Sequence, residues 1–77
     1  MKKEYFESIK QMLPVLRQMQ ETIESYADEE QEKFDSLSER AQESEKGEAM
    51  EDLIYNLQDA SSSLEDAIDS LEEVIDV

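Results

Sequence analysis

Residues 50–77 have the sequence MEDLIYNLQDASSSLEDAIDSLEEVIDV, in which apolar residues recur every seven positions. With Met50 at position a of a heptad abcdefg, the a series is Met50, Leu57, Leu64 and Leu71, and the d series is Leu53, Ala60, Ala67 and Val74. Such a pattern is typical of helices that pack along a coiled-coil seam. The last three heptads, LQDASSS, LEDAIDS and LEEVIDV, form an imperfect internal repeat. The pattern therefore predicts a long helix over about residues 45–76.

The N-terminal part of the chain has the same apolar period. Its a series is Ile9, Leu16 and Ile23, and its d series is Tyr5, Met12, Met19 and Tyr26. Gly and Pro, the residues that most often interrupt helices, occur once each in the chain. The pattern predicts a helix over about residues 3–33. Because Pro14 lies at the outward position f and the apolar period continues through it, we expect a kinked but continuous helix, with a break into two helices as the alternative.

Residues 34–44, FDSLSERAQES, connect the two expected helices. Ser36 and Glu39 have the spacing of a capping box, which predicts a short helical turn over residues 37–42. Ser44 is the expected N-cap of the C-terminal helix. Two helices of similar length joined by a short connection pack against each other in opposite directions. The sequence therefore predicts an all-α, antiparallel helical hairpin that forms a single domain over the whole 77-residue chain.

We expect positions a and d to form the seam between the two helices. A register in which paired residue numbers add up to about 79–80 places the methionines of the d series opposite the alanines of the d series, and close packing favours this alternation of large and small side chains. Position e then flanks the seam, and its apolar residues form an exposed strip beside the free ends of the hairpin. This e strip consists of Phe6, Leu13, Ile54, Ile68 and Ile75.

Two helices alone leave the e strip uncovered. A core this small rarely contributes more than about 3–5 kcal/mol, and oligomerisation is a common remedy. We therefore expect a two-fold homodimer that forms a four-helix bundle with the e strip at its interface. The alternative is that the e strip is a groove for the helix of a partner protein.

Charge is concentrated in the C-terminal helix. The chain has 22 Asp and Glu against 7 Lys and Arg, a formal net charge of −15, and residues 47–77 contain ten acids and no base. The acids at the outward positions b, c and f are Glu51, Asp52, Asp59, Glu65, Asp66, Asp69, Glu72, Glu73 and Asp76. Ten charges over this helix amount to one per ~4.6 Å, not far from the ~3.4 Å phosphate spacing of one DNA strand. This density favours a surface that imitates a nucleic acid, with a solvated face that keeps a small bundle in solution as the alternative.

One aromatic residue lies among these acids. Tyr55 is at the outward position f, with Asp52 three residues before it and Asp59 four residues after it. A tolerated surface aromatic residue is the simpler interpretation. The functional hypothesis is an anchor for a partner, because an exposed tyrosine between carboxylates suits an Arg-lined surface.

The composition excludes several classes of function. Without His or Cys the chain cannot form a zinc site, a Cys nucleophile or a Ser-His-Asp triad, and one Gly is too few for a phosphate-binding loop. We expect no catalytic residue, cofactor or specific metal site, and hence no enzyme. The negative charge argues against direct binding to nucleic acid or anionic lipid. With no apolar run near ~20 residues and no signal peptide, we expect a cytoplasmic protein.

Residues 29–76 resemble small acidic helical-hairpin proteins encoded by phages and mobile elements of Gram-positive bacteria. Those proteins have a helix, a connection of the form E-x-x-F/Y-D-N-L/I-P-E-x-L-Q-x-S, and a helix rich in Leu, Glu and Ala. The matching residues of the connection are Phe34, Asp35, Leu37, Glu39, Gln42 and Ser44. The sequence departs from the pattern at Ser38, where Pro is usual, and at Ala41, where Leu is usual. The resemblance implies the cytoplasm of a bacterial host, a setting in which small, very acidic helical proteins are often inhibitors of host DNA-processing or defence enzymes.

Two hypotheses of function follow. The first is a non-enzymatic inhibitor, a dimeric helical bundle whose acidic face occupies the nucleic-acid-binding surface of a basic host protein such as a nuclease, helicase or defence effector. The second is a structural or adaptor bundle that binds a partner helix through the e strip, with the charge serving solubility. Salt distinguishes them, because a complex between charged surfaces weakens at high salt and an apolar contact does not.

Overall fold

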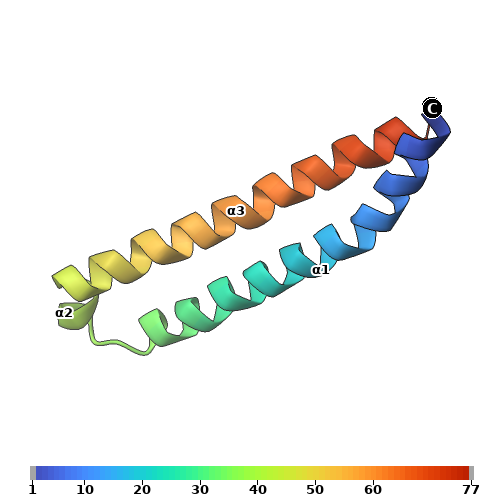
Figure 1. Ribbon diagram of the computed structural model, residues 1–77. Helices are drawn as coiled ribbons and strands as arrows, with labels where there is room; N and C mark the ends of the chain where they lie inside the picture. The colour runs from blue at the N-terminus through green and yellow to red at the C-terminus, as the bar shows by residue number, and fades with distance from the viewer. Residues whose placement is uncertain (1, 77) are drawn as a thin grey trace.

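The computed structural model describes residues 2–76 and contains three helices, α1 (Lys2–Asp35), α2 (Glu39–Gln42) and α3 (Glu45–Ile75). The long helices α1 and α3 pack side by side in opposite directions, and α2 lies in the connection at one end (Figure 1). The molecule is a rod with extents of 58 × 14 × 14 Å. The predicted all-α antiparallel hairpin is therefore confirmed.

Pro14 lies inside α1, which is helical without interruption from its first residue to its last. The alternative of two separate helices is therefore wrong. Figure 1 shows the N-terminal part of α1 curving towards the end of α3. Leu13, directly before the proline, is buried. Packing of this leucine against α3 stabilises the helix at the turn where Pro14 removes a backbone hydrogen bond.

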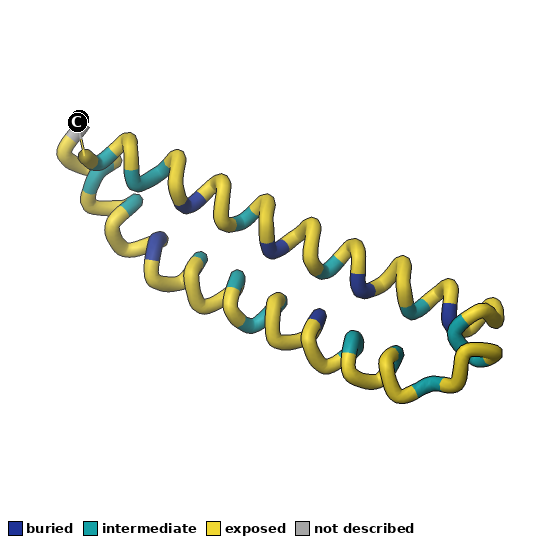
Figure 2. Tube along the Cα trace, turned by 180° about the vertical axis from the view of Figure 1, so that it is seen from behind, coloured by how far each residue is buried: buried dark blue, intermediate teal, exposed yellow. Residues whose placement is uncertain are grey.

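The seam between α1 and α3 follows positions e and a, so the expected a/d seam is wrong. The most buried side chains of the hairpin all lie at position e, and they are Leu13, Ala27, Ile54, Ser61 and Ile68. Residues of the a series are half-buried, and those of the d series are exposed. Figure 2 shows the buried positions along the facing sides of the two long helices. The e strip therefore lies inside the hairpin, where Phe6 and Ile75 are half-buried at its open end.

The physical reason for this seam is that the chain has three apolar positions in each heptad. Positions e and a alternate at spacings of three and four residues, as a and d do, so either pair can form a seam. Position e brings branched residues such as Leu13, Ile54 and Ile68 together, whereas position d contains two alanines and two tyrosines. Burying e places these branched side chains in the seam and leaves the tyrosine hydroxyl groups of position d in contact with water.

A polar pair interrupts the seam near its middle. The amide Nε2 of Gln20 donates a hydrogen bond of 3.2 Å to Oγ of Ser61, and both groups are partly buried. The residue numbers of this pair add up to 81, close to the register expected from the sequence. The same register places Leu13 level with Ile68. It is thus the choice of seam that differs from the prediction, while the pairing of the helices along their length agrees with it.

Replacing this polar pair by apolar residues is expected to stabilise the hairpin. The double variant Gln20→Leu, Ser61→Ala removes both partners together and adds apolar burial, so we expect the free energy of unfolding to rise by about 1–2 kcal/mol. Ser61→Ala alone deprives the Gln20 amide of its partner and is expected to lower it by about 0.5–1 kcal/mol. Urea unfolding followed by circular dichroism measures both changes. A double variant less stable than Ser61→Ala would contradict the expectation.

Serine side chains and one glutamine organise the connection. Ser38 is the N-cap of α2 and accepts from the Ala41 amide at 3.2 Å, whereas Ser36 donates to the carbonyl of Glu32 at the end of α1. The capping box expected at Ser36 is therefore wrong. The side-chain amide Nε2 of Gln42 donates to two carbonyls, that of Phe34 in the last turn of α1 at 3.0 Å and that of Leu37 in the connection at 3.3 Å. The Phe34 carbonyl also accepts from the Leu37 backbone amide at 3.0 Å, so the Gln42 side chain links the last turn of α1 to the connection.

Ser44 is the N-cap of α3, as predicted. Its hydroxyl accepts a hydrogen bond from the Gly47 amide at 3.2 Å and donates one to the carbonyl of Ala41. Gly47 is buried where the end of α2 meets the start of α3. A Cβ at this position would lie 2.5 Å from the Ala41 carbonyl oxygen and closer still to that of Gln42. The junction therefore depends on the absence of a side chain at residue 47.

Candidate partner-binding surface

The acidic residues of α3 form a continuous exposed surface. Of the nine acids predicted at positions b, c and f, eight lie on α3 and Asp76 is its C-cap. All are exposed except the half-buried Glu72. We call this group, together with Tyr55, the acidic surface: Glu51, Asp52, Tyr55, Asp59, Glu65, Asp66, Asp69, Glu72, Glu73 and Asp76. Its carboxylates follow the length of α3 with no base on that helix after Lys46. The α3 surface is therefore of one sign over nearly its whole length.

A single ion pair joins the two long helices among the side chains that the structure describes. Nη2 of Arg17 lies 2.7 Å from Oε2 of Glu72, and each side chain is a little under half exposed. Both residues lie at position b, so the b positions of α1 and α3 share one flank of the hairpin. A partly exposed pair of this kind contributes about 0–1 kcal/mol to stability. Its main consequence is that Glu72, alone in the acidic surface, already has a basic partner within residues 3–76.

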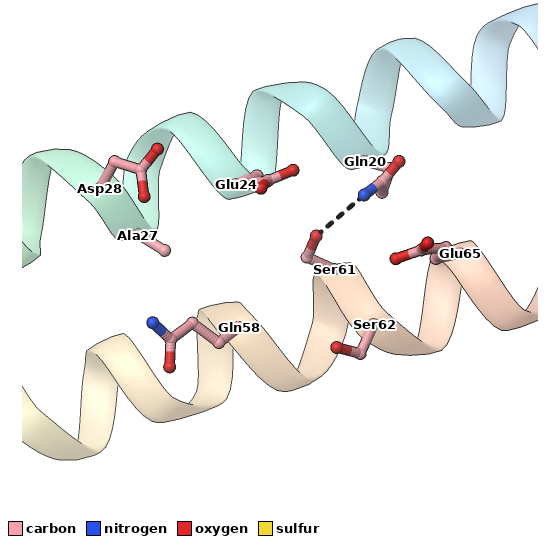
Figure 3. A pocket seen from close by; sticks show the side chains of 8 residues that line it. All are labelled: Gln20, Glu24, Ala27, Asp28, Gln58, Ser61, Ser62 and Glu65. Carbon is pink, nitrogen blue, oxygen red and sulfur yellow. Dashed lines mark hydrogen bonds between the residues drawn. The ribbon is translucent and has the colours of Figure 1, made fainter.

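A polar cleft opens on the same flank, beside the Gln20–Ser61 pair. It has a volume of about 190 Å³, and acids enter it from both helices, Glu24 and Asp28 from α1 and Glu65 from α3 (Figure 3). The remaining lining residues are Ala27, Gln58 and Ser62. Because Ser61 is small, it leaves space between the helices that a larger residue would fill. Three carboxylates around such a cleft suit a guanidinium or ammonium group of a partner.

Tyr55 lies further along this flank, towards the connection. Its side chain is 68% exposed and lines a shallow cleft of about 160 Å³ with Phe34 and Glu51. The other lining residues are Gln31, Ile54 and Gln58. An aromatic ring that stands in water beside carboxylates is placed to stack on an arginine of a partner. The position of Tyr55 therefore agrees with its predicted place in the acidic surface.

The opposite flank carries no charge along most of its length. It consists of positions d and g, which hold no charged residue in residues 3–28 or 49–76. Its large apolar side chains are all exposed, and they are Tyr5, Met12, Val15, Met19, Tyr26, Leu53 and Val74. Small residues separate them, namely Ser8, Asn56, Ala60, Ser63, Ala67 and Ser70. We call these two groups the neutral face. A seam at a and d would have buried its d residues, so the sequence did not predict this surface.

Other kinds of site receive no support from the part of the chain that the structure describes. Among residues 2–76 no three acidic side chains are arranged to hold a metal ion. None of the described helices contains a stretch that is both long and apolar enough to cross a membrane.

Comparison of the chain with protein-family models, with curated proteins and with solved structures gives no match. The resemblance to hairpin proteins of phages and mobile elements therefore stays a prediction from the residues of the connection. The function of the acidic surface is therefore inferred from its geometry and charge alone.

Proposed function

We propose that this protein is a non-enzymatic inhibitor that binds a basic host protein through the acidic surface and occupies its nucleic-acid-binding site. The observation that carries the proposal is the segregation of charge: carboxylates follow one side of the rod, and the opposite flank is neutral. A surface that served only solubility would carry both signs, because repulsion between like charges destabilises the folded state. We place this inhibitor in the cytoplasm of a bacterium, encoded by a phage or mobile element, and acting as a homodimer.

Three features of the acidic surface support binding to a nucleic-acid-binding protein. The helix α3 holds its carboxylates in a fixed row, so no ordering of a flexible acidic tail is needed on binding. Glu24 and Asp28 of α1 extend the negative surface across the seam around the polar cleft. Tyr55 adds an aromatic ring of the kind that anchors protein interfaces. Together these features provide charge, a cleft for a basic side chain and an anchor.

The proposal is tested by capturing partners from a host lysate on the immobilised protein at low salt. We expect a captured nuclease, helicase or defence effector to be released by added DNA and by raised salt, because charged contacts are screened. The triple variant Asp59→Asn, Asp66→Asn, Asp69→Asn keeps the shape of the surface and removes three charges. It is expected to weaken binding at least tenfold at low salt and to flatten the salt dependence. Glu4→Gln, at an exposed acid of α1 outside both the acidic surface and the neutral face, is the control that should bind like the unmodified chain.

A partner that binds the protein and DNA at the same time would overturn the proposal. So would a complex whose affinity the triple variant leaves unchanged. The adaptor hypothesis required an exposed e strip, and Leu13, Ile54 and Ile68 are instead buried within the hairpin. The e strip is therefore not accessible to the partner helix that the adaptor hypothesis proposed.

A further inference from the structure

We propose that the neutral face is the contact between two copies of this chain, related by a two-fold axis parallel to the helices, so that both connections lie at the same end of a four-helix bundle. The inference deepens the proposed homodimer by naming its interface and its symmetry. It is independent of whether the acidic surface has a partner. It also replaces the e strip, which the hairpin buries, as the expected interface.

The area left exposed is what a stable dimer needs. The chain exposes 6083 Å², against about 4,900 Å² for a compact monomer of its 9.0 kDa mass. The seven large apolar side chains of the neutral face together expose roughly 750 Å², close to the ~800 Å² that each partner contributes to a stable interface. The monomer thus exposes about 1,200 Å² more than a compact protein of its mass, which is more than the ~800 Å² that one partner buries in such a contact. The large apolar part of the exposed surface lies on the neutral face.

Charge selects a second copy as the occupant. Each chain carries a net charge of −15, so two copies can approach closely only through surfaces without acids. The neutral face is such a surface, and face-to-face packing directs both acidic surfaces outward. Positions d and g themselves carry no charge between residues 3 and 28 or between residues 49 and 76, so the face offers no charged group that would select a partner of opposite sign.

The sizes of the side chains select the symmetry. The d residues of α1 are large (Tyr, Met, Met, Tyr), and those of α3 are mostly smaller (Leu, Ala, Ala, Val). A two-fold axis parallel to the helices places α1 of one copy against α3 of the other, so that Met12 lies level with the partner subunit's Ala67. An axis perpendicular to the helices places α1 against α1 and α3 against α3. That arrangement crowds the large residues and leaves voids beside the small ones, both of which are unfavourable.

Sedimentation equilibrium tests the interface. We expect the native chain to sediment at twice 9.0 kDa at micromolar concentration. Ala67→Glu, on the neutral face, is expected to remain helical and to sediment as a monomer, because each copy then brings a carboxylate into the contact. Ser62→Glu adds the same charge to the same helix on the opposite flank and is expected to remain a dimer. The proposal is overturned if the native chain is a monomer, or if both variants dimerise equally well.

Distances between labels test the symmetry. The chain has no Cys, so Glu43→Cys, at an exposed position beside α2, gives one labelling site per copy. With both connections at one end, spin labels are expected within about 40 Å of each other, since neighbouring helices lie about 10 Å apart. With the connections at opposite ends of a rod 58 Å long, the labels would be about 50 Å or more apart, which would overturn the proposed symmetry.

Two further outcomes separate this inference from the inhibitor proposal. The triple Asn variant of the acidic surface is expected to dimerise like the native chain, even where it no longer binds a target. A chain that stays monomeric but loses a captured host protein on Ala67→Glu would show that a partner helix covers the neutral face, and would overturn the second copy as its occupant.

Discussion

Ile68→Asp is expected to unfold the hairpin. Ile68 is 4% exposed and lies in the seam between α1 and α3, one heptad from Ser61 towards the open end of the hairpin. Loss of a buried isoleucine costs about 2–5 kcal/mol, and a carboxylate without a partner in that position adds a desolvation cost. The sum exceeds the roughly 3–5 kcal/mol that a core of this size supplies. Far-ultraviolet circular dichroism at 25 °C should therefore show loss of most of the helical signal.

Two controls distinguish the buried seam from a general effect of the substitution. Tyr55→Asp introduces the same acid on the same helix at an exposed position and is expected to keep the helical signal. Ile68→Val keeps the residue apolar and is expected to cost only about 0.5–1.5 kcal/mol. If Ile68→Asp kept its helical signal, Ile68 would be an exposed flanking residue. In that case the a/d seam would be correct and the e/a seam wrong.

Gly47→Ala is expected to lower the stability of the protein, although alanine is by far the better helix former. The gain in helix propensity is at most about 1 kcal/mol. Against it, the new Cβ would lie 2.5 Å from the carbonyl oxygen of Ala41 and closer to that of Gln42, and both are backbone atoms that cannot rotate away. Opening the junction to relieve this contact also weakens the cap from Ser44. We expect a net loss of about 2 kcal/mol, or roughly 8–16 °C in melting temperature.

The matched control for this prediction is Glu48→Ala. Residue 48 is the next position of the same helix and is exposed, so alanine there should change the free energy of unfolding by no more than about 0.5 kcal/mol. Thermal unfolding of both variants under the same conditions makes the comparison. A Gly47→Ala variant that melted at or above the native temperature would show that the junction between α2 and α3 is looser than described.

The architecture of this protein is predictable from its sequence, but its seam is not. The seven-residue period and the short connection predict two long antiparallel helices, and the structure has them. The period alone cannot choose between e/a and a/d, because both pairs have the same spacing along a helix. A preference for branched residues such as Ile54 and Ile68 over alanine and tyrosine in the core would have indicated e/a. The junction at Gly47 also lies beyond the sequence, because it depends on carbonyl groups of the preceding turn.

The candidate site also has one part that the sequence predicts and one part that it does not. The acids of α3 lie at outward positions whichever seam forms, so their exposure follows from the helical period. The polar cleft depends on residues of α1, such as Glu24 and Asp28, that lie beside Glu65 only in the folded hairpin. The neutral face follows directly from the seam and was therefore missed together with it. Charge could have located it, since positions d and g lack acids over residues 3–28 and 49–76 in a chain that is otherwise rich in them.

The hydrogen bond between Gln20 and Ser61 has a consequence for how faithfully this hairpin assembles. The heptads of α3 are so alike that α1 could slip along it by one full repeat and still find apolar residues opposite its own. Such a slip would move Gln20 from Ser61 to Ile54 or Ile68, and its amide would lose its partner between apolar side chains. A buried polar group without a partner costs about 1–3 kcal/mol, a large fraction of the roughly 3–5 kcal/mol that a core of this size supplies. The Gln20–Ser61 layer, the least apolar of the seam, thus fixes the register between the two helices.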